Sequence, residues 1–204
     1  MSQQERTAAQ QTHALQKLLD LKSATPFQTA AAAVIGSGAD PSFRTMTIDK
    51  GTQDGLRADM AVIAPAGVVG RILVPTARAS KVQLIIDRDA AVGVMVERTR
   101  ATGVATGVGS PESLDYRAGL LDLDYLPGSV DVRKGDRVVT AGIDGIYPKG
   151  LPIGEIQSAG RVGGEWHIKI KPVVDFSSLE AVLVVLQVPK EAPDAEQPAD
   201  DGER

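Results

Sequence analysis

The chain has 204 residues, which allows one large domain or two small ones at about 150 residues per domain. Hydrophobic residues make up 43% and charged residues 24% of the chain, so wholesale disorder is excluded. The formal net charge is −4, and residues 190–204 alone contribute it, with six acids and two bases. The rest of the chain offers no basic excess, so we expect no nucleic-acid partner. The absence of cysteine excludes a disulfide framework and a thiol nucleophile.

The first 25 residues predict one helix. This segment is rich in Gln, Ala and Leu, and it contains neither Gly nor Pro before Pro26. Leu15, Leu18 and Leu19 cluster on such a helix and form a candidate dimerisation face. Polar residues interrupt the heptad seam, so two roles stay open. The helix is either a coiled-coil arm that dimerises or a helix that packs weakly on its own domain.

From residue 30 onward the pattern changes to that of β-strands. Runs of β-branched residues alternate with turns rich in Gly, Pro and Asp. We predict twelve short strands, at residues 30–35, 43–49, 60–64, 68–74, 81–86, 91–97, 103–108, 120–124, 137–140, 153–157, 166–174 and 181–188. Twelve strands are too many for one small barrel. The sequence therefore predicts an all-β fold of two small six-stranded β-barrel-like domains, preceded by the N-terminal helix.

These strands divide into two domains. We assign residues 27–88 together with 160–188 to the first barrel and residues 89–159 to the second. Residues 189–204 contain three prolines and many acids but almost nothing apolar, so we predict a disordered acidic tail. The longest apolar runs have six residues, far short of the roughly 18 that a membrane span needs.

The sequence offers no constellation of catalytic residues. His13 lies in the predicted helix, and His167 lies on the polar face of a predicted strand. Asp175 and Ser177 follow His167 too closely along one segment to converge easily on it as a triad. Isolated pairs of acids lack the remaining ligands of a calcium loop. We therefore predict no enzyme activity, no catalytic residue, no metal site and no cofactor.

Glycine-punctuated motifs follow one another in a fixed order along residues 30–186. Early blocks are Ile48-Asp49-Lys50-Gly51 and Gly67-Val68-Val69-Gly70-Arg71-Ile72. The most specific block spans residues 135–154 and reads Gly-Asp-Arg-Val-Val-Thr-Ala-Gly-Ile-Asp-Gly-Ile-Tyr-Pro-Lys-Gly-Leu-Pro-Ile-Gly. In this order, the blocks resemble the rod-shape-determining MreC family.

The resemblance implies a non-enzymatic scaffold of the bacterial elongation machinery. It implies two β-barrel-like domains in the periplasm, preceded by a coiled-coil arm and, in the full-length protein, by a single helix anchored in the inner membrane. That anchor is not present in this chain, which we expect to be a periplasmic fragment. The implied partners are RodA, a class B penicillin-binding protein, MreD and, through the cytoplasmic or transmembrane part, MreB. Self-association to dimers or filaments is also implied.

The turn at residues 142–150 is a candidate surface for a partner or a second copy. Ile143, Ile146 and Tyr147 stand between glycines there and could project outward. The alternative is that Ile146 and Tyr147 cap the end of their own barrel. Two other functional classes also stay open: a periplasmic adaptor subunit of an efflux or secretion complex, which would usually show a long helical hairpin, and a trypsin-like hydrolase.

Overall fold

The computed structural model describes residues 3–38, 40 and 42–187. The predicted tail, residues 189–204, lies outside the described residues. Within the described part, no helix combines the length and the apolar character needed to cross a lipid bilayer. The predicted helix is present as α1 (Gln3–Ala24), and two short helical turns follow it, η1 (Thr52–Asp54) and α2 (Leu114–Arg117).

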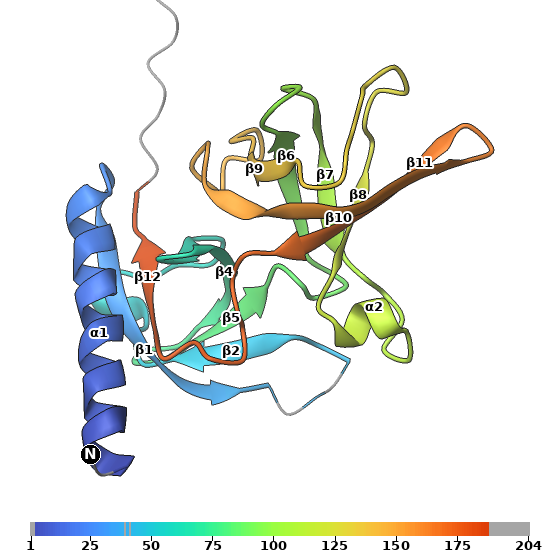
Figure 1. The fold of residues 1–204 in the computed structure, drawn as a ribbon. Helices are drawn as coiled ribbons and strands as arrows, with labels where there is room; N and C mark the ends of the chain where they lie inside the picture. The colour runs from blue at the N-terminus through green and yellow to red at the C-terminus, as the bar shows by residue number, and fades with distance from the viewer. Residues whose placement is uncertain (1–2, 39, 41, 188–204) are drawn as a thin grey trace, which may run out of the picture.

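Twelve antiparallel strands form two closed barrels of six strands each, which confirms the predicted fold class (Figure 1). The first barrel has the order β1-β12-β3-β4-β5-β2 and contains β1 (Thr29–Ser37), β2 (Thr45–Ile48), β3 (Ala61–Ala64), β4 (Gly67–Pro75), β5 (Ser80–Leu84) and β12 (Ala181–Val185). The second barrel has the order β10-β11-β8-β7-β6-β9 and contains β6 (Ala91–Val96), β7 (Thr102–Gly107), β8 (Leu121–Asp124), β9 (Arg137–Thr140), β10 (Pro152–Val162) and β11 (Glu165–Pro172).

The predicted boundary between the barrels at residue 160 is wrong. Strands β10 and β11 form one hairpin, and both belong to the second barrel, so this barrel continues to Pro172. The hairpin turns at Gly163 and Gly164, which both have positive φ, a conformation that glycine adopts without strain. Only β12 returns to the first barrel, where it pairs with β1 and β3.

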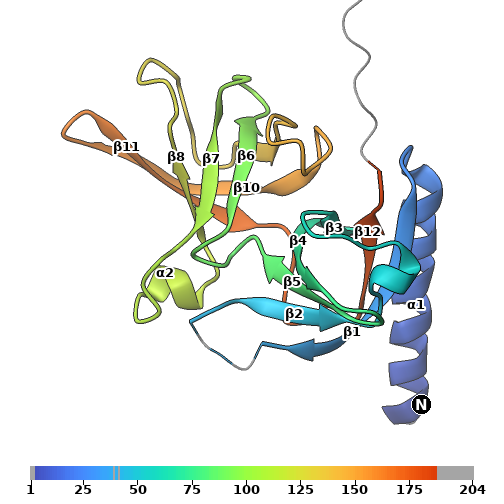
Figure 2. The ribbon, with the colours of Figure 1, turned by 180° about the vertical axis from the view of Figure 1, so that it is seen from behind.

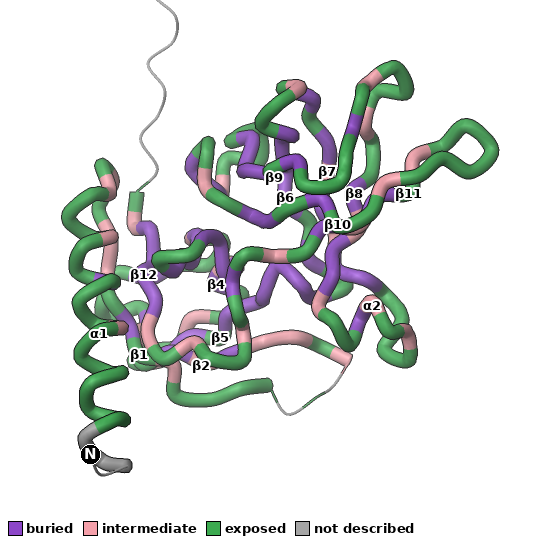
Figure 3. The backbone as a smooth tube through the Cα atoms, in the orientation of Figure 1, coloured by how far each residue is buried: buried purple, intermediate pink, exposed green. Residues whose placement is uncertain are grey.

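Both barrels are filled by inward-facing aliphatic side chains. Because side chains alternate between the two faces of a strand, every second residue points inward, and the largest of these are at most 2% exposed: Ile48, Ile63, Ile72 and Leu183 in the first barrel and Leu121, Ile153, Ile156 and Ile170 in the second. Figure 3 shows this burial along the barrel strands, with an exposed helix α1 and an exposed tip of the β10–β11 hairpin. One continuous apolar cluster contains residues of both barrels, so the barrels pack directly on each other.

Two close main-chain contacts join the barrels. Strand β4 of the first barrel meets β10 of the second, and a Cβ at Gly67 would lie 2.3 Å from the carbonyl oxygen of Pro152. A Cβ at Gly107 of β7 would likewise lie 2.2 Å from the carbonyl oxygen of Asp87, in the segment that connects the barrels. Only glycine permits approaches this close, so the two positions let the barrels sit in direct contact.

Candidate interaction surfaces

Helix α1 lies along the outer side of the first barrel, away from the second barrel (Figures 1 and 2). Leu18 is only 6% exposed and belongs to the barrel core, and Leu21 packs against that core one turn later. Leu15 and Leu19 are 55% and 57% exposed. At 100° per residue, Leu15 and Leu19 both lie on the same flank of the helix, turned away from the side shared by Leu18 and Leu21. The structure therefore does not bring the three predicted leucines together on one partner-facing side.

The turn at residues 142–150 is held by hydrogen bonds to the side chains of Asp144, within it, and of Thr140, just before it. The Asp144 carboxylate accepts hydrogen bonds from the backbone N–H groups of Gly93, Ile146 and Tyr147, at 3.1, 3.0 and 3.2 Å. The Thr140 hydroxyl donates to the carbonyl of Pro148 at 2.5 Å and accepts from the N–H of Leu151 at 2.8 Å. The Asp144 carboxylate thus fixes the backbone of this turn through three hydrogen bonds.

Tyr147 lies inside the molecule and does not project from this turn. Its side chain is 3% exposed and belongs to the core cluster that both barrels share. Burial raises the pKa of its hydroxyl. Two charges from the first barrel also change this pKa: Arg71 lowers it and Asp59 raises it. Ile146 packs partly against the same core, whereas Ile143 is 69% exposed. Of the three candidate residues, Tyr147 is therefore buried at the junction of the barrels and Ile146 is partly buried, and only Ile143 is exposed.

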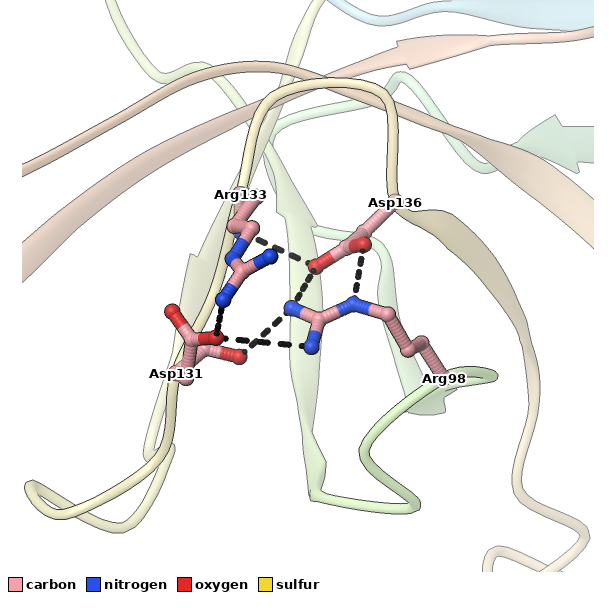
Figure 4. A network of polar contacts seen from close by, with 4 residues as sticks. All are labelled: Arg98, Asp131, Arg133 and Asp136. Carbon is pink, nitrogen blue, oxygen red and sulfur yellow. Dashed lines mark hydrogen bonds and ion pairs between the residues drawn. The ribbon is translucent and has the colours of Figure 1, made fainter.

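A second acid of the same motif also has a structural role. Arg98, in the turn between β6 and β7, donates to both carboxylate oxygens of Asp136, from Nε at 2.7 Å and from Nη2 at 2.8 Å (Figure 4). The backbone N–H of Arg133 donates to the same carboxylate at 2.9 Å, and Asp131 bridges Arg98 and Arg133. The Arg98 hydrogen bonds lower the pKa of Asp136. This network ties the β6–β7 turn to the loop before β9.

Sequence reasoning missed a buried polar centre at the junction of the barrels. Asp87 is 1% exposed, and its carboxylate accepts hydrogen bonds from the backbone N–H of Arg44 at 2.6 Å, the backbone N–H of Asp89 at 3.0 Å and the side-chain amide of Gln83 at 3.1 Å. Buried polar groups are costly unless they are hydrogen-bonded, so this set holds the junction together. One feature of the sequence could have indicated that Asp87 is buried: it directly follows the apolar pair Ile85-Ile86.

The described residues contain no group of three or more side chains placed to hold a metal ion. His13 lies exposed on α1, and His167 lies exposed on β11 opposite Gly160. The hydroxyl of Ser177 donates to the Asp175 carboxylate at 2.6 Å, within a turn that follows β11. An acid that accepts directly from the serine leaves no histidine between them, as a hydrolytic triad would require.

Comparison with known proteins matches both barrels to one family. A family model described as "Rod shape-determining protein MreC, barrel core" matches residues 34–186. The chain belongs to the MreC family. The MreC of Caulobacter vibrioides, a cell shape-determining protein, is 32% identical over 176 residues, which is 86% of this chain and 47% of that relative. This chain therefore spans about half the length of that MreC.

Solved MreC structures share the two-barrel fold. The major periplasmic domain from the cell shape-determining filament MreC superposes with a TM-score of 0.66 at 20% identity, covering 78% of this chain and 95% of that chain. A complex between the penicillin-binding protein PBP2 and MreC from Helicobacter pylori contains a chain that superposes with a TM-score of 0.62 at 16% identity, covering 79% of this chain and 99% of that one.

Proposed function

We propose that this chain is a non-enzymatic periplasmic scaffold of the bacterial elongation machinery that binds a class B penicillin-binding protein. The match of the family model across both barrels carries the proposal. The complex of a related MreC with PBP2 supports the choice of partner. The same match favours a scaffold over an efflux or secretion adaptor, and over a trypsin-like hydrolase.

The geometry suits a scaffold. In a closed barrel the strands pair around the whole circumference, so the barrel exposes no long free edge for uncontrolled pairing. Its surface is also preformed, so binding of a partner there costs little conformational entropy. We further propose that RodA shares the assembly with the penicillin-binding protein, and that MreD and MreB couple to parts of a longer protein that includes this chain. Self-association would multiply weak contacts along the membrane.

The first experiment captures the periplasmic domain of a class B penicillin-binding protein on the immobilised chain. We expect the wild-type chain to bind it and Ile143→Glu to weaken binding about tenfold, because a charge would enter an apolar contact. Val162→Glu is the matched control, since Val162 is 67% exposed at the tip of the β10–β11 hairpin, outside this turn. Equal binding by the two variants would remove the turn from the interface, and no binding by the folded wild-type chain would refute the proposed function.

Self-association through α1 is tested by sedimentation over a wide concentration range. We propose that Leu15 and Leu19, the two exposed leucines of the helix, meet a second copy. Leu15→Glu with Leu19→Glu should then shift the chain toward monomer, because two charges would have to be buried at the contact. The control places two charges on an exposed flank of the helix away from Leu15 and Leu19, as Ala9→Glu with His13→Glu. If the wild-type chain is already a monomer at every concentration, α1 does not dimerise on its own.

A further inference from the structure

A cleft of about 470 Å³ opens beside the junction of the barrels, next to α2. Its walls come from both barrels: Arg44 precedes β2, Arg117 ends α2, and Lys171 lies near the end of β11. Figures 1 and 2 show α2 on the same side of the molecule as the start of β2. The apolar part of the lining includes Ile86 and Phe176. The cleft therefore combines apolar surface with cationic side chains from three separate segments.

The charge of this cleft is unbalanced. Arg44, Arg117 and Lys171 line it, and in the described part of the chain none of the three forms an ion pair. Among the described residues, the only acid that lines the cleft is Asp175, whose carboxylate already accepts from the hydroxyl and the backbone N–H of Ser177, at 2.6 and 3.0 Å. The site thus offers positive charge to a ligand with negative charge.

Arg44 is held in place for such a role. Its guanidinium stacks on the ring of Tyr116 with the carbon Cζ 4.0 Å from the ring centre, and it donates to the carbonyl of Tyr116. Its backbone N–H is bound by Asp87. A guanidinium fixed in this way loses less side-chain entropy when it binds a carboxylate, which lowers the cost of the contact.

The chain itself carries a segment of complementary charge. Residues 188–204 contain six acids and two bases, whereas the remaining residues are neutral overall. Twelve residues separate Asp175 in the cleft from Gln187, a distance of at most about 40 Å. The last three acids, Asp200, Asp201 and Glu203, lie 13 to 16 residues beyond Gln187 and reach about 43–53 Å when extended. The length of the segment is therefore sufficient for its final acids to enter the cleft.

We propose that the cationic cleft between the barrels binds the chain's own acidic C-terminal segment through Asp200, Asp201 and Glu203. The tether supplies an effective concentration on the order of millimolar, so even a millimolar intrinsic affinity leaves the cleft about half occupied. An acidic peptide of another protein would have to displace this segment. The cleft is then a site for acidic peptides that is regulated by the chain itself.

The test uses paramagnetic relaxation in the 204-residue chain. Because the chain has no cysteine, Ala199→Cys gives a single site for a spin label. At low salt we expect the amide resonances of Gly119 and Val173, which line the cleft, to lose at least half of their intensity. This loss should disappear at about 0.5 M salt, where the Debye length falls to about 4 Å. It should also disappear when Asp200→Asn, Asp201→Asn and Glu203→Gln are combined.

The double variant Arg117→Glu/Lys171→Glu tests the site itself. We expect it to abolish the broadening, whereas the control Arg78→Glu/Lys81→Glu, which changes the net charge equally at two exposed residues of the β4–β5 hairpin, should retain it. Absent broadening, broadening spread evenly over the surface, or equal loss in both variants would overturn the proposal. So would broadening of isotope-labelled chain by spin-labelled chain in a mixture, because the segment would then bind a second copy.

Discussion

Replacing Tyr147 with alanine should lower the free energy of unfolding by about 3–5 kcal/mol, the range for truncating a large buried aromatic side chain. Tyr147 is 3% exposed and packs in the cluster that both barrels share, so its removal leaves a cavity at the junction. Denaturant unfolding measures the change directly. The loss should appear as a lower transition midpoint with little change in its slope, as expected when stability alone changes.

The matched control for this variant is Ile143→Ala in the same turn. Ile143 is 69% exposed, so its truncation should change the free energy of unfolding by no more than about 0.5 kcal/mol. The pair of variants separates a core role from a surface role within one turn. A mild effect of Tyr147→Ala, equal to that of Ile143→Ala, would contradict the buried position of the tyrosine. Any loss of partner binding in Tyr147→Ala must therefore be corrected for its loss of folding.

The second large effect is expected at the polar centre of the junction. Asp87→Ala would leave three donors without their acceptor: the buried side-chain amide of Gln83 and the partly buried backbone N–H groups of Arg44 and Asp89. A buried unsatisfied group costs about 1–3 kcal/mol, and the two partly buried donors cost less because water can reach them, so the variant should lose roughly 3 kcal/mol of unfolding free energy. Asp87→Asn should be milder, because its side-chain oxygen still accepts hydrogen bonds, although its amide group faces donors.

Asp89→Ala provides the control for Asp87→Ala. Asp89 lies two residues away and is exposed, and its carboxylate is 3.9 Å from Arg88 at the surface. Such exposed ion pairs contribute about 1 kcal/mol or less, so this variant should unfold close to the wild-type midpoint. Thermal and denaturant unfolding of both variants are sufficient to check the contrast. Equal stability of Asp87→Ala and Asp89→Ala would mean that the junction does not depend on the buried carboxylate.

The residues of the motif that identifies the family mainly stabilise turns. Asp136 and Asp144, both in the block of residues 135–154, use their carboxylates to hold backbone N–H groups. The order of such motifs along the chain is therefore sufficient to recognise the family. The same motifs did not locate a partner surface, because the side chains that build a turn are engaged with their own backbone. Of the three candidate residues in that block, Ile143, Ile146 and Tyr147, only Ile143 is exposed.

Errors of prediction arose where contacts span long stretches of sequence. The helical pattern of α1 was readable locally, but the packing of Leu18 against the first barrel depends on strands that follow much later. The assignment of β11 to the first barrel failed for a similar reason. The strands of the two barrels have similar sequence patterns. Which barrel β11 completes depends on its pairing with β8, and local patterns do not encode that pairing.

By itself, the sequence determined the twelve strands, the all-β class, the pair of barrels and the family, because alternation, turn residues and ordered motifs are local properties of the chain. Tertiary structure alone decided which barrel received β11, and it decided that Tyr147, Leu18 and Asp87 are buried. Burial of a residue depends on which side chains pack against it, and here those side chains come from distant parts of the chain. The same closure brings Arg44, Arg117 and Lys171 together from three segments to line one cleft.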